Sequence, residues 1–298
     1  MEKKSKYLQK RRRKQGGFMT YKKIDIHQHA NQVEYLPDGS IQPILGTSIH
    51  SKSTTDEEII FHTLEYMDKH NIEKSVLSGS SLERVYKWVE ESSDRFIPGL
   101  MFFTKPFPDL EMLREEIKAG RIRFMGEICA QFSGVPPNDP SLEPYYALAE
   151  EYDLSVHIHC AGYGPPVLTW RIRHGNPLLL EDVLSKHRDM RIFVENAGYP
   201  FLQEIIALMM IYPNVYADLS TITWSIPENA FYDYLERLIN SSGVIGLPTD
   251  KRLLFGSDQM SWPETIEWAV NRIEQAPFLS EEQKRDIFYN NAKRFLRL

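Results

Sequence analysis

The sequence predicts a single-domain α/β protein, a (β/α)8 TIM barrel. Short β-branched or apolar runs alternate along the chain with longer amphipathic segments, which is the rhythm of repeated βαβ units. Eight such pairs fit within 298 residues, and a TIM barrel needs about 250 residues. A doubly wound open sheet is the alternative, but it usually has fewer strands, and no glycine-rich phosphate loop follows the first run.

The predicted strands are short apolar runs separated by polar segments. In chain order they are Lys23–His29, Lys74–Ser80, Arg95–Phe103, Ile122–Ile128, Leu154–Cys160, Arg191–Ala197, Val215–Ser220 and Arg252–Asp258. Helices are expected near residues 56–70, 82–93, 109–120, 141–153, 176–188, 200–211, 227–241 and 263–276. Several begin favourably: Thr55 can cap the first of these helices, and Pro177 and Pro263 suit a first turn.

Two segments lie outside this alternation. Residues 1–18 carry eight Lys or Arg against one Glu, a charge of +7, which leaves −13 on the barrel at 19–298. We expect a disordered basic tail, because the segment has little apolar surface to bury. A nucleic-acid or membrane tether is the alternative, but the tail has no interleaved aromatic residues and the body is acidic. Asn31 to Thr54 is expected to form a long first loop, a lid over the site.

The composition limits the class of protein. Hydrophobic content of 42% and charged content of 26% are ordinary for a globular protein. No apolar run approaches the ~20 residues of a membrane span, and no secretory signal is visible. Cys129 and Cys160 are the two cysteines, which excludes a disulfide framework and fits a reducing compartment. We expect a cytoplasmic protein with a small-molecule partner, not nucleic acid or membrane; a homo-oligomer stays open.

His27 and His29, at the end of the first predicted strand, are the strongest single indication of function. Residues two apart on a strand point the same way, so two imidazoles converge. Imidazole is a common ligand of zinc and similar divalent ions, and a metal at a strand end can hold an activated water. Alone, the pair could arise by chance or serve hydrogen bonding. Further metal-ligand residue types end other predicted strands: Glu127, His157, His159 and Asp258.

Taken in order, these strand ends resemble the amidohydrolase superfamily. The resemblance is to its amidohydrolase-related branch, which includes the aminocarboxymuconate-semialdehyde decarboxylase relatives, and it spans roughly Lys22 to Leu298. It is carried by Asp25–His29, Met125–Ile128, Val156–His159, Asn196–Pro200, Asn214–Ser220, Leu254–Asp258 and the closing segment Asn290–Leu296.

The resemblance implies one divalent ion per chain, with zinc as the first expectation. The implied ligands are His27, His29, His159 and Asp258. The family's ligand ends strand five, which selects His159 over His157, and His157 would lie one layer deeper as a hydrogen-bonded core histidine. Glu127 is expected to hydrogen-bond a ligand histidine, and the alternative is that it bridges a second ion.

Asp258 and Asn196 decide the predicted reaction. In hydrolytic relatives the strand-eight aspartate also takes the proton from the attacking water, so Asp258 is the expected catalytic residue. The branch usually ends strand six in a histidine followed two residues later by glycine, and Asn196 stands in that place before Gly198. In decarboxylating relatives this histidine is thought to handle proton transfer, and Asn cannot exchange a proton near neutral pH.

We therefore predict a metal-dependent hydrolase. It would attack an amide, ester or lactone carbonyl of a small, carboxylated substrate. A decarboxylase of the same family is the alternative, and a non-catalytic binding barrel is a more distant one, because buried ligand residues are costly to retain without use.

Loop residues at the strand ends are expected to bind the substrate. Arg171 and Arg173 could clamp a carboxylate, and Asn196 could donate a hydrogen bond to a carbonyl oxygen. The expected contacts also include His174, Trp224 and Trp262, with ordinary loop packing as the alternative for each. The remaining histidines of the first loop and the predicted helices should face solvent or cap helices: His50, His62, His70 and His187. The alternative for His50 is that it enters the site if its loop folds inward.

Removing the basic tail is expected to leave the folded protein unchanged, since the tail has charge but almost no apolar area to bury. A chain that starts at Met19 should keep its melting temperature and its metal content. Thermal melting and metal analysis of both chains check this. A loss of several degrees in the shorter chain would show that the tail docks on the acidic body.

Overall fold

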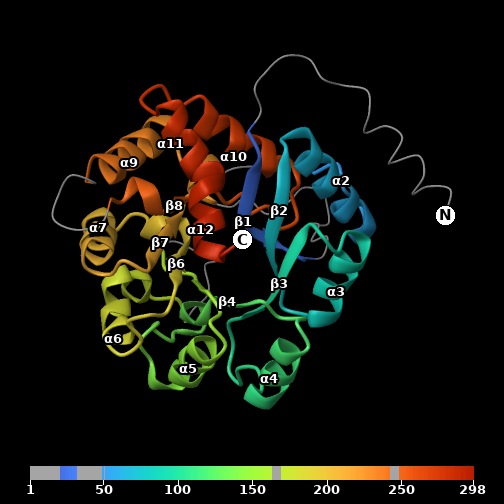
Figure 1. Ribbon diagram of the computed structural model, residues 1–298, viewed down its shortest axis with the longest axis vertical. Helices are drawn as coiled ribbons and strands as arrows, with labels where there is room; N and C mark the ends of the chain where they lie inside the picture. The colour runs from blue at the N-terminus through green and yellow to red at the C-terminus, as the bar shows by residue number, and fades with distance from the viewer. Residues whose placement is uncertain (1–20, 32–48, 50, 163–168, 242–247) are drawn as a thin grey trace.

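Eight parallel strands form one sheet in the order β1 to β8, and helices surround them (Figure 1). The computed structural model describes residues 21–31, 49, 51–162, 169–241 and 248–298, so the predicted tail, most of the predicted lid and His50 lie outside the described residues. Hydrogen bonds from Ile26 N to Phe255 O and from Asp258 N to His27 O join the first strand to the segment after the last. The predicted single-domain TIM barrel is confirmed.

The strands overlap the predicted runs, and the later ones are shorter. They are β1 (Lys23–His29), β2 (Ile72–Ser78), β3 (Phe96–Phe102), β4 (Phe124–Ile128), β5 (Val156–Ile158), β6 (Ile192–Val194), β7 (Val215–Asp218) and β8 (Leu253–Leu254). The chain leaves β6 at once because Asn196 and Ala197 have φ of 56° and 46°, which no strand allows. A similar turn follows β8, where Asp258 has φ of 45°.

The helices also follow the prediction, with short additions. They are α2 (Asp56–Lys69), α3 (Leu82–Glu91), α4 (Leu110–Lys118), α5 (Glu143–Glu151), α6 (Glu181–Leu184), α7 (Leu202–Ile211), α8 (Ile222–Ser225), α9 (Glu228–Asn240), α10 (Glu264–Glu274), α11 (Glu281–Arg285) and α12 (Asn291–Leu296). Thr55 caps α2 as expected, because its side chain accepts from Glu58 N. The helix expected at 176–188 is α-helical only over α6, after a 3₁₀ turn at Pro177–Leu180. Within the described ranges, none of these helices is long and apolar enough to cross a membrane.

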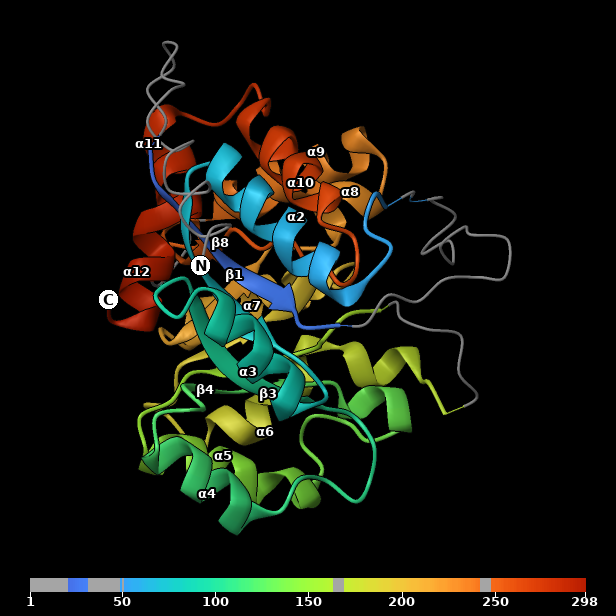
Figure 2. The same ribbon diagram turned by 90° about the vertical axis from the view of Figure 1, so that its right-hand side faces the viewer.

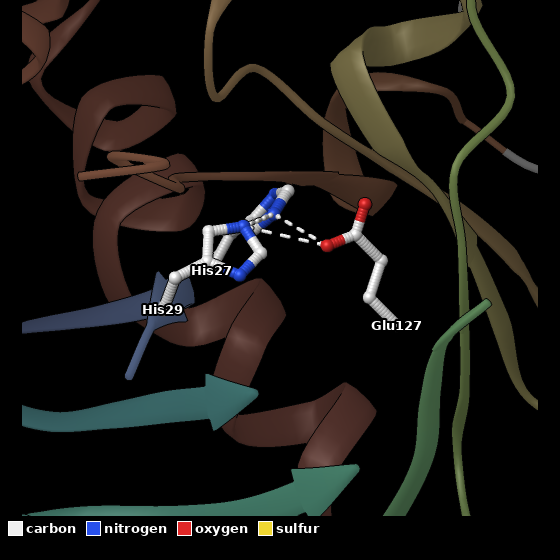
Figure 3. Close-up of side chains that lie close together, drawn as sticks. All are labelled: His27, His29 and Glu127. Carbon is white, nitrogen blue, oxygen red and sulfur yellow. Dashed lines mark hydrogen bonds and ion pairs between the residues drawn. The ribbon is translucent and has the colours of Figure 1, made fainter. Parts of the chain in front are cut away.

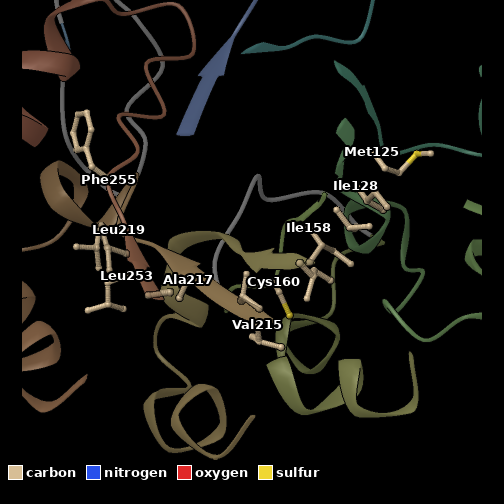
Figure 4. Close-up of a cluster of buried hydrophobic side chains, with 14 of the residues drawn as sticks. Met125, Ile128, Ile158, Cys160, Val215, Ala217, Leu219, Leu253 and Phe255 are labelled. Carbon is tan, nitrogen blue, oxygen red and sulfur yellow. The ribbon is translucent and has the colours of Figure 1, made fainter. Parts of the chain in front are cut away.

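Two apolar layers hold the barrel together. Inside it, Phe124 and Phe193 pack with other strand residues and with Phe295 of α12. Figure 2 shows α12 at the end from which β1 starts, so this helix closes the amino end of the barrel. A second layer lies between strands and helices, and Figure 4 shows part of it. The polar residues that end or follow the parallel strands gather at the opposite, carboxyl end.

His187 does not face solvent as expected; it is 6% exposed. Its Nδ1 lies 2.9 Å from Glu150 Oε2 and its Nε2 lies 3.0 Å from Glu143 Oε1. The two glutamates are two turns apart on one face of α5, and Lys186 also approaches Glu143. Burial lowers the pKa of His187, but the hydrogen bonds with Glu150 and Glu143 outweigh it, so the pKa lies above its ordinary value.

His187→Gln is expected to destabilise the protein more at low pH than at high pH. A raised folded pKa means that the charged histidine stabilises the fold fully below its unfolded pKa of about 6.5. This stabilisation is lost as the pH rises through the folded pKa. Melting temperatures of both proteins at about pH 6 and about pH 9 test the sign. A difference that did not change with pH would contradict a charged His187.

Candidate metal centre

His27 and His29 meet at the carboxyl end of β1. Their Nε2 atoms are 3.0 Å apart, and both side chains are buried. Each ring is oriented by its other nitrogen: His27 Nδ1 lies 2.8 Å from Asp218 Oδ2, and His29 Nδ1 lies 3.0 Å from Ser78 Oγ. Such partners are typical of metal-binding imidazoles. They leave both Nε2 atoms facing the same point.

Two carboxylates approach that point. Glu127 Oε2 lies 3.3 Å from His29 Nε2 and 3.6 Å from His27 Nε2, and Figure 3 shows these three side chains. Asp258 Oδ1 lies 3.0 Å from His29 Nε2 and 3.7 Å from His27 Nε2. Both carboxylate oxygens are buried and have no hydrogen-bond partner. A buried oxygen without a donor is costly, so a cation is the natural group to complete it.

The donor set fits a divalent cation. The nitrogen–nitrogen and nitrogen–oxygen separations in the cluster run from 3.0 to 3.7 Å. Ligands held about 2.0–2.2 Å from a tetrahedral or octahedral ion are about 3.0–3.5 Å from one another. Imidazole and carboxylate donors suit zinc and manganese alike. The residues therefore fit the divalent cation expected from the sequence, but they do not distinguish zinc from manganese.

The segment after β8 places Asp258. Asp25 Oδ1 accepts from His27 N and Ser257 N, which ties β1 to this segment, and burial raises the pKa of Asp25 to about 6. Gly256 packs so closely that a Cβ there would lie 2.8 Å from His27 Cβ. Asp258 Oδ2 accepts from Thr221 Oγ1. Burial opposes ionisation of Asp258, but His27 and His29 outweigh it and hold the pKa of this carboxyl below its usual range.

His159 and Glu195 extend the cluster beyond Glu127. His159 Nδ1 lies 3.2 Å from Glu127 Oε1 and 3.6 Å from Glu195 Oε2. Glu195 Oε2 lies 3.9 Å from His27 Nε2, and neither Glu195 oxygen has a hydrogen-bond partner. Burial and the neighbouring Glu127 raise the pKa of Glu195 well above its usual range. Burial raises the pKa of Glu127, but the hydrogen bonds with His159 and His27 outweigh burial and hold the pKa of this carboxyl well below its usual range.

Glu195 and Asp218 were not among the predicted site residues. Alternation along β6 could have found Glu195, because Phe193 points into the barrel and residues two apart on a strand share a face. Alternation along β7 similarly pairs Asp218 with the inward-facing Tyr216.

Asn196 presents one free donor. Its main-chain N donates to Asp218 Oδ1 at 2.7 Å, and its side-chain Oδ1 accepts from Ser220 Oγ and Thr221 N, each at 3.1 Å. These contacts fix which way the amide points. Its Nδ2 is buried without a hydrogen-bond partner. The side chain therefore keeps one N–H donor unpaired, and its predicted hydrogen bond to a substrate stays a prediction.

His157 lies among aromatic rings inside the barrel. Its ring centroid is 4.0 Å from that of Phe124 and 4.1 Å from that of Phe193. Its Nε2 lies 3.1 Å from Ser155 Oγ. Burial and the nearby His27 lower its pKa well below the ordinary value, so this histidine is neutral.

The predicted substrate-binding residues divide into exposed and buried groups. Arg171 and Arg173 are exposed, and the partly buried His174 has its pKa lowered by burial and by these two arginines. Trp224 and Trp262 are buried edge to face, with ring centroids 6.3 Å apart. Trp224 Nε1 donates to Ser257 O at 2.8 Å, beside Asp258. Their substrate contacts stay a prediction.

A second aromatic wall combines Trp170, an expected substrate-facing residue, with Phe132, which was not predicted. The ring of Phe132 lies 4.8 Å from that of His159 and 5.1 Å from that of Trp170. Phe132 follows β4 and Trp170 follows β5, so the two side chains border the same side of the cluster. Such apolar rings exclude water and suit a planar substrate body.

The chain is similar to known proteins in sequence and in fold. Residues 24–298 match the model of the amidohydrolase family. Protein fluG of Emericella nidulans is 28% identical over 97 residues. This match covers 33% of the chain and spans 10% of the length of that relative.

Solved structures share the fold at low sequence identity. An uncharacterised TIM-barrel protein of Bordetella bronchiseptica aligns with a TM-score of 0.67 at 20% identity, covering 93% of this chain and 99% of that one. The 4-oxalomesaconate hydratase of Rhodopseudomonas palustris aligns with a TM-score of 0.61 at 16% identity, covering 92% and 95%. The 5-carboxyvanillate decarboxylase of Novosphingobium aromaticivorans, solved with manganese, aligns with a TM-score of 0.58 at 14% identity, covering 97% and 99%.

Proposed function

The chain belongs to the amidohydrolase family, and we propose that it is a metal-dependent lyase that removes carbon dioxide from a small carboxylic acid. Family membership and the buried His and Glu cluster make it a metal-dependent enzyme. Some structures of similar fold are named as a decarboxylase or a hydratase, which supports lyase chemistry over the hydrolysis expected from the sequence, while others are named as amidohydrolases.

Glu195 is the observation that carries the proposal. Decarboxylation was disfavoured because Asn196 cannot exchange a proton, and the structure brings the preceding residue, Glu195, into the same cluster. Its carboxyl lies 3.6 Å from His159 Nδ1 and 3.9 Å from His27 Nε2, with neither oxygen hydrogen-bonded. A carboxyl can hold a proton and release it to carbon. Glu195 therefore offers the proton donor that Asn196 lacks.

Each residue of the cluster has a separate role in the proposed reaction. A divalent cation held by His27, His29 and Asp258 would bind substrate oxygen atoms and stabilise the negative charge that develops as the bond breaks. The Nδ2 of Asn196 donates to a substrate oxygen and orients the carboxylate to be lost. As carbon dioxide leaves, the electron pair of the broken carbon–carbon bond stays on the substrate carbon. That carbon takes the proton from Glu195.

An assay of two compound classes tests the proposal. Aromatic and muconate-type acids are assayed beside carboxylated lactones, esters and amides, in deuterated water and with released carbon dioxide measured. We expect carbon dioxide from at least one acid, with deuterium on the carbon that lost it. Hydrolysis of a lactone, ester or amide without carbon dioxide release from any acid would overturn the proposal. Glu195→Gln should slow the release by about 10²–10⁴-fold, whereas Glu236→Gln, on the exposed side of α9, should not.

Hydrolysis remains the second candidate because of the geometry of Asp258. Its Oδ2 is anchored by Thr221, while Oδ1 faces the two histidines without a hydrogen-bond donor. A carboxylate in that position can take the proton from an attacking water. The same assay separates the two candidates, since a hydrolase forms new acid and alcohol or amine groups without losing carbon.

A further inference from the structure

We propose that a basic hollow at the amino end of the barrel binds a phosphate group, either free phosphate or the phosphate of a small monoester. The hollow has a volume of about 520 Å³ and is lined by residues of α12, at the end opposite the metal centre (Figure 2). Small-molecule sites commonly have volumes of roughly 300–1,000 Å³. The proposed lyase reaction does not use this hollow, so the site goes beyond that function. Its polar lining residues are Lys251, Asp286, Asn290, Lys293, Arg294 and Arg297.

The helical spacing at the end of the chain gathers these side chains. Asn290, Lys293, Arg294 and Arg297 are spaced i, i+3, i+4 and i+7, which places side chains on one face of a helix. Lys251 joins them from the short turn before β8, because Arg294 Nη2 donates to Lys251 O at 2.7 Å. One side of the hollow is therefore helical and the other belongs to the turn that leads into the barrel.

Some of the charges around the hollow are already paired. Asp286 supplies the one carboxylate among the described lining side chains. Its Oδ2 lies 2.5 Å from Lys251 Nζ, and its Oδ1 accepts from Asn290 Nδ2 at 2.7 Å. Arg297 Nη1 donates to Asp153 Oδ2. The charges of Lys251, Asp286 and Arg297 are thus satisfied without a ligand.

Lys293 and Arg294 carry the positive charge that is left over. Neither has a carboxylate partner in the part of the chain that the structure describes. Lys293 Nζ lies 5.8 Å from the ring centroid of Tyr289. Arg294 Nη2 donates to two uncharged oxygens, Lys251 O and Asn291 Oδ1. These bonds orient the guanidinium through one nitrogen, so little side-chain freedom is lost when the other N–H groups bind a ligand.

Two unpaired positive charges match the charge of a phosphate group. A phosphate monoester carries about −1.5 to −2 charges at pH 7. The planar guanidinium of Arg294 can bond two phosphate oxygens at once, and the ammonium of Lys293 adds a second, compact charge. The hollow is larger than a phosphate group and has room for the organic part of a monoester. Residues 19–298 carry a charge of −13, so this basic hollow departs from the acidic character of the body.

A bound phosphate should also stabilise the closed end of the barrel. Arg294 already connects α12 to the turn before β8, and Phe295 of α12 packs against Phe193 inside the barrel. A ligand that binds the folded protein and not the unfolded chain raises its stability as the ligand concentration rises. The melting temperature should therefore increase with added phosphate.

Calorimetric titration of the full-length protein with inorganic phosphate and with glycerol 3-phosphate tests the site. We expect one ligand per chain, with weaker binding at higher salt. The double variant Lys293→Gln/Arg294→Gln should weaken binding by about 10–100-fold, because charged hydrogen bonds are lost. The matched control is Lys87→Gln/Lys118→Gln, which removes the same charge from exposed positions on α3 and α4 and should bind as the wild type does. Tighter binding of glycerol 3-phosphate would identify a monoester as the ligand, and equal binding would identify free phosphate.

Two further variants guard against misfolding and against phosphate held elsewhere. Lys293→Gln alone leaves the anchored Arg294 in place and should weaken binding by about tenfold. His29→Ala should bind phosphate as the wild type does, since His29 lies at the other end of the barrel.

The ordinary role of cations near a helix C-terminus is to stabilise the helix end. If that were their only role here, the variants at Lys293 and Arg294 would lower the melting temperature without changing phosphate binding. That result, or a wild type that binds neither compound at millimolar concentration, would overturn the phosphate site. Both results would leave the proposed lyase reaction standing, because it takes place at the carboxyl end.

Discussion

Asp258→Asn is expected to lower turnover by about 10²–10⁴-fold, because the variant loses the carboxylate charge that would hold the cation in the proposed reaction and would take the proton in hydrolysis. Asn keeps the size of the side chain and can still accept from Thr221 Oγ1, so the local structure should persist. It loses the negative charge that Asp258 Oδ1 directs at the two β1 histidines, 3.0 and 3.7 Å away. The change should therefore affect kcat or metal affinity and not the fold.

Parallel measurements separate these effects. Metal content and melting temperature are measured with kcat for Asp258→Asn and for Asp233→Asn, a control on α9 whose side chain is 71% exposed. The control should match the wild type in all three. Unchanged turnover in Asp258→Asn at full metal loading would contradict a catalytic role for Asp258.

His29→Ala is expected to remove about one divalent ion per chain, with most of the activity. Its Nε2 lies within 3.0 to 3.3 Å of three other donor atoms, those of His27, Asp258 and Glu127. Alanine removes one of the proposed ligands itself. Removal of a residue that only hydrogen-bonds a metal ligand already lowers metal affinity by about 10–100-fold, so the loss should be at least as large here. Metal analysis of the purified variant measures the loss.

A second histidine serves as the control for this variant. His62 lies on α2, where its Nδ1 is 2.9 Å from Ser53 Oγ, and it makes no contact with the cluster among the described residues. His62→Ala should therefore retain the metal. If His29→Ala kept its full metal content and activity, the β1 histidines would not be ligands.

The barrel was predictable because its signals are local. Each strand is a short apolar run, and each major helix carries its own period and often its own cap, as Thr55 does for α2. The convergence of His27 and His29 was predictable for the same reason, since it depends only on the alternation along one strand. The closure by α12 was harder, because it depends on contacts of Phe295 with Phe193 and Tyr216, remote in sequence.

Glu195 was not predicted, although alternation with Phe193 places its side chain inside the barrel. Regular alternation would send the next side chain, that of Asn196, to the opposite face. Positive φ at Asn196 instead turns the chain out of β6, and no local sequence pattern predicts that turn. His187 was missed for a different reason: its partners, Glu143 and Glu150, lie on another helix, and pairing across helices leaves no local signal.

The central claim is that the buried side chains at the carboxyl end of β1 hold a divalent cation, and anomalous diffraction tests it most directly. A crystal grown with manganese or zinc, measured at the absorption edge of the added metal, should show an anomalous peak about 2.0–2.3 Å from the Nε2 atoms of both His27 and His29. A crystal whose metal content is confirmed by fluorescence, but which shows no peak near these nitrogens, would contradict the account.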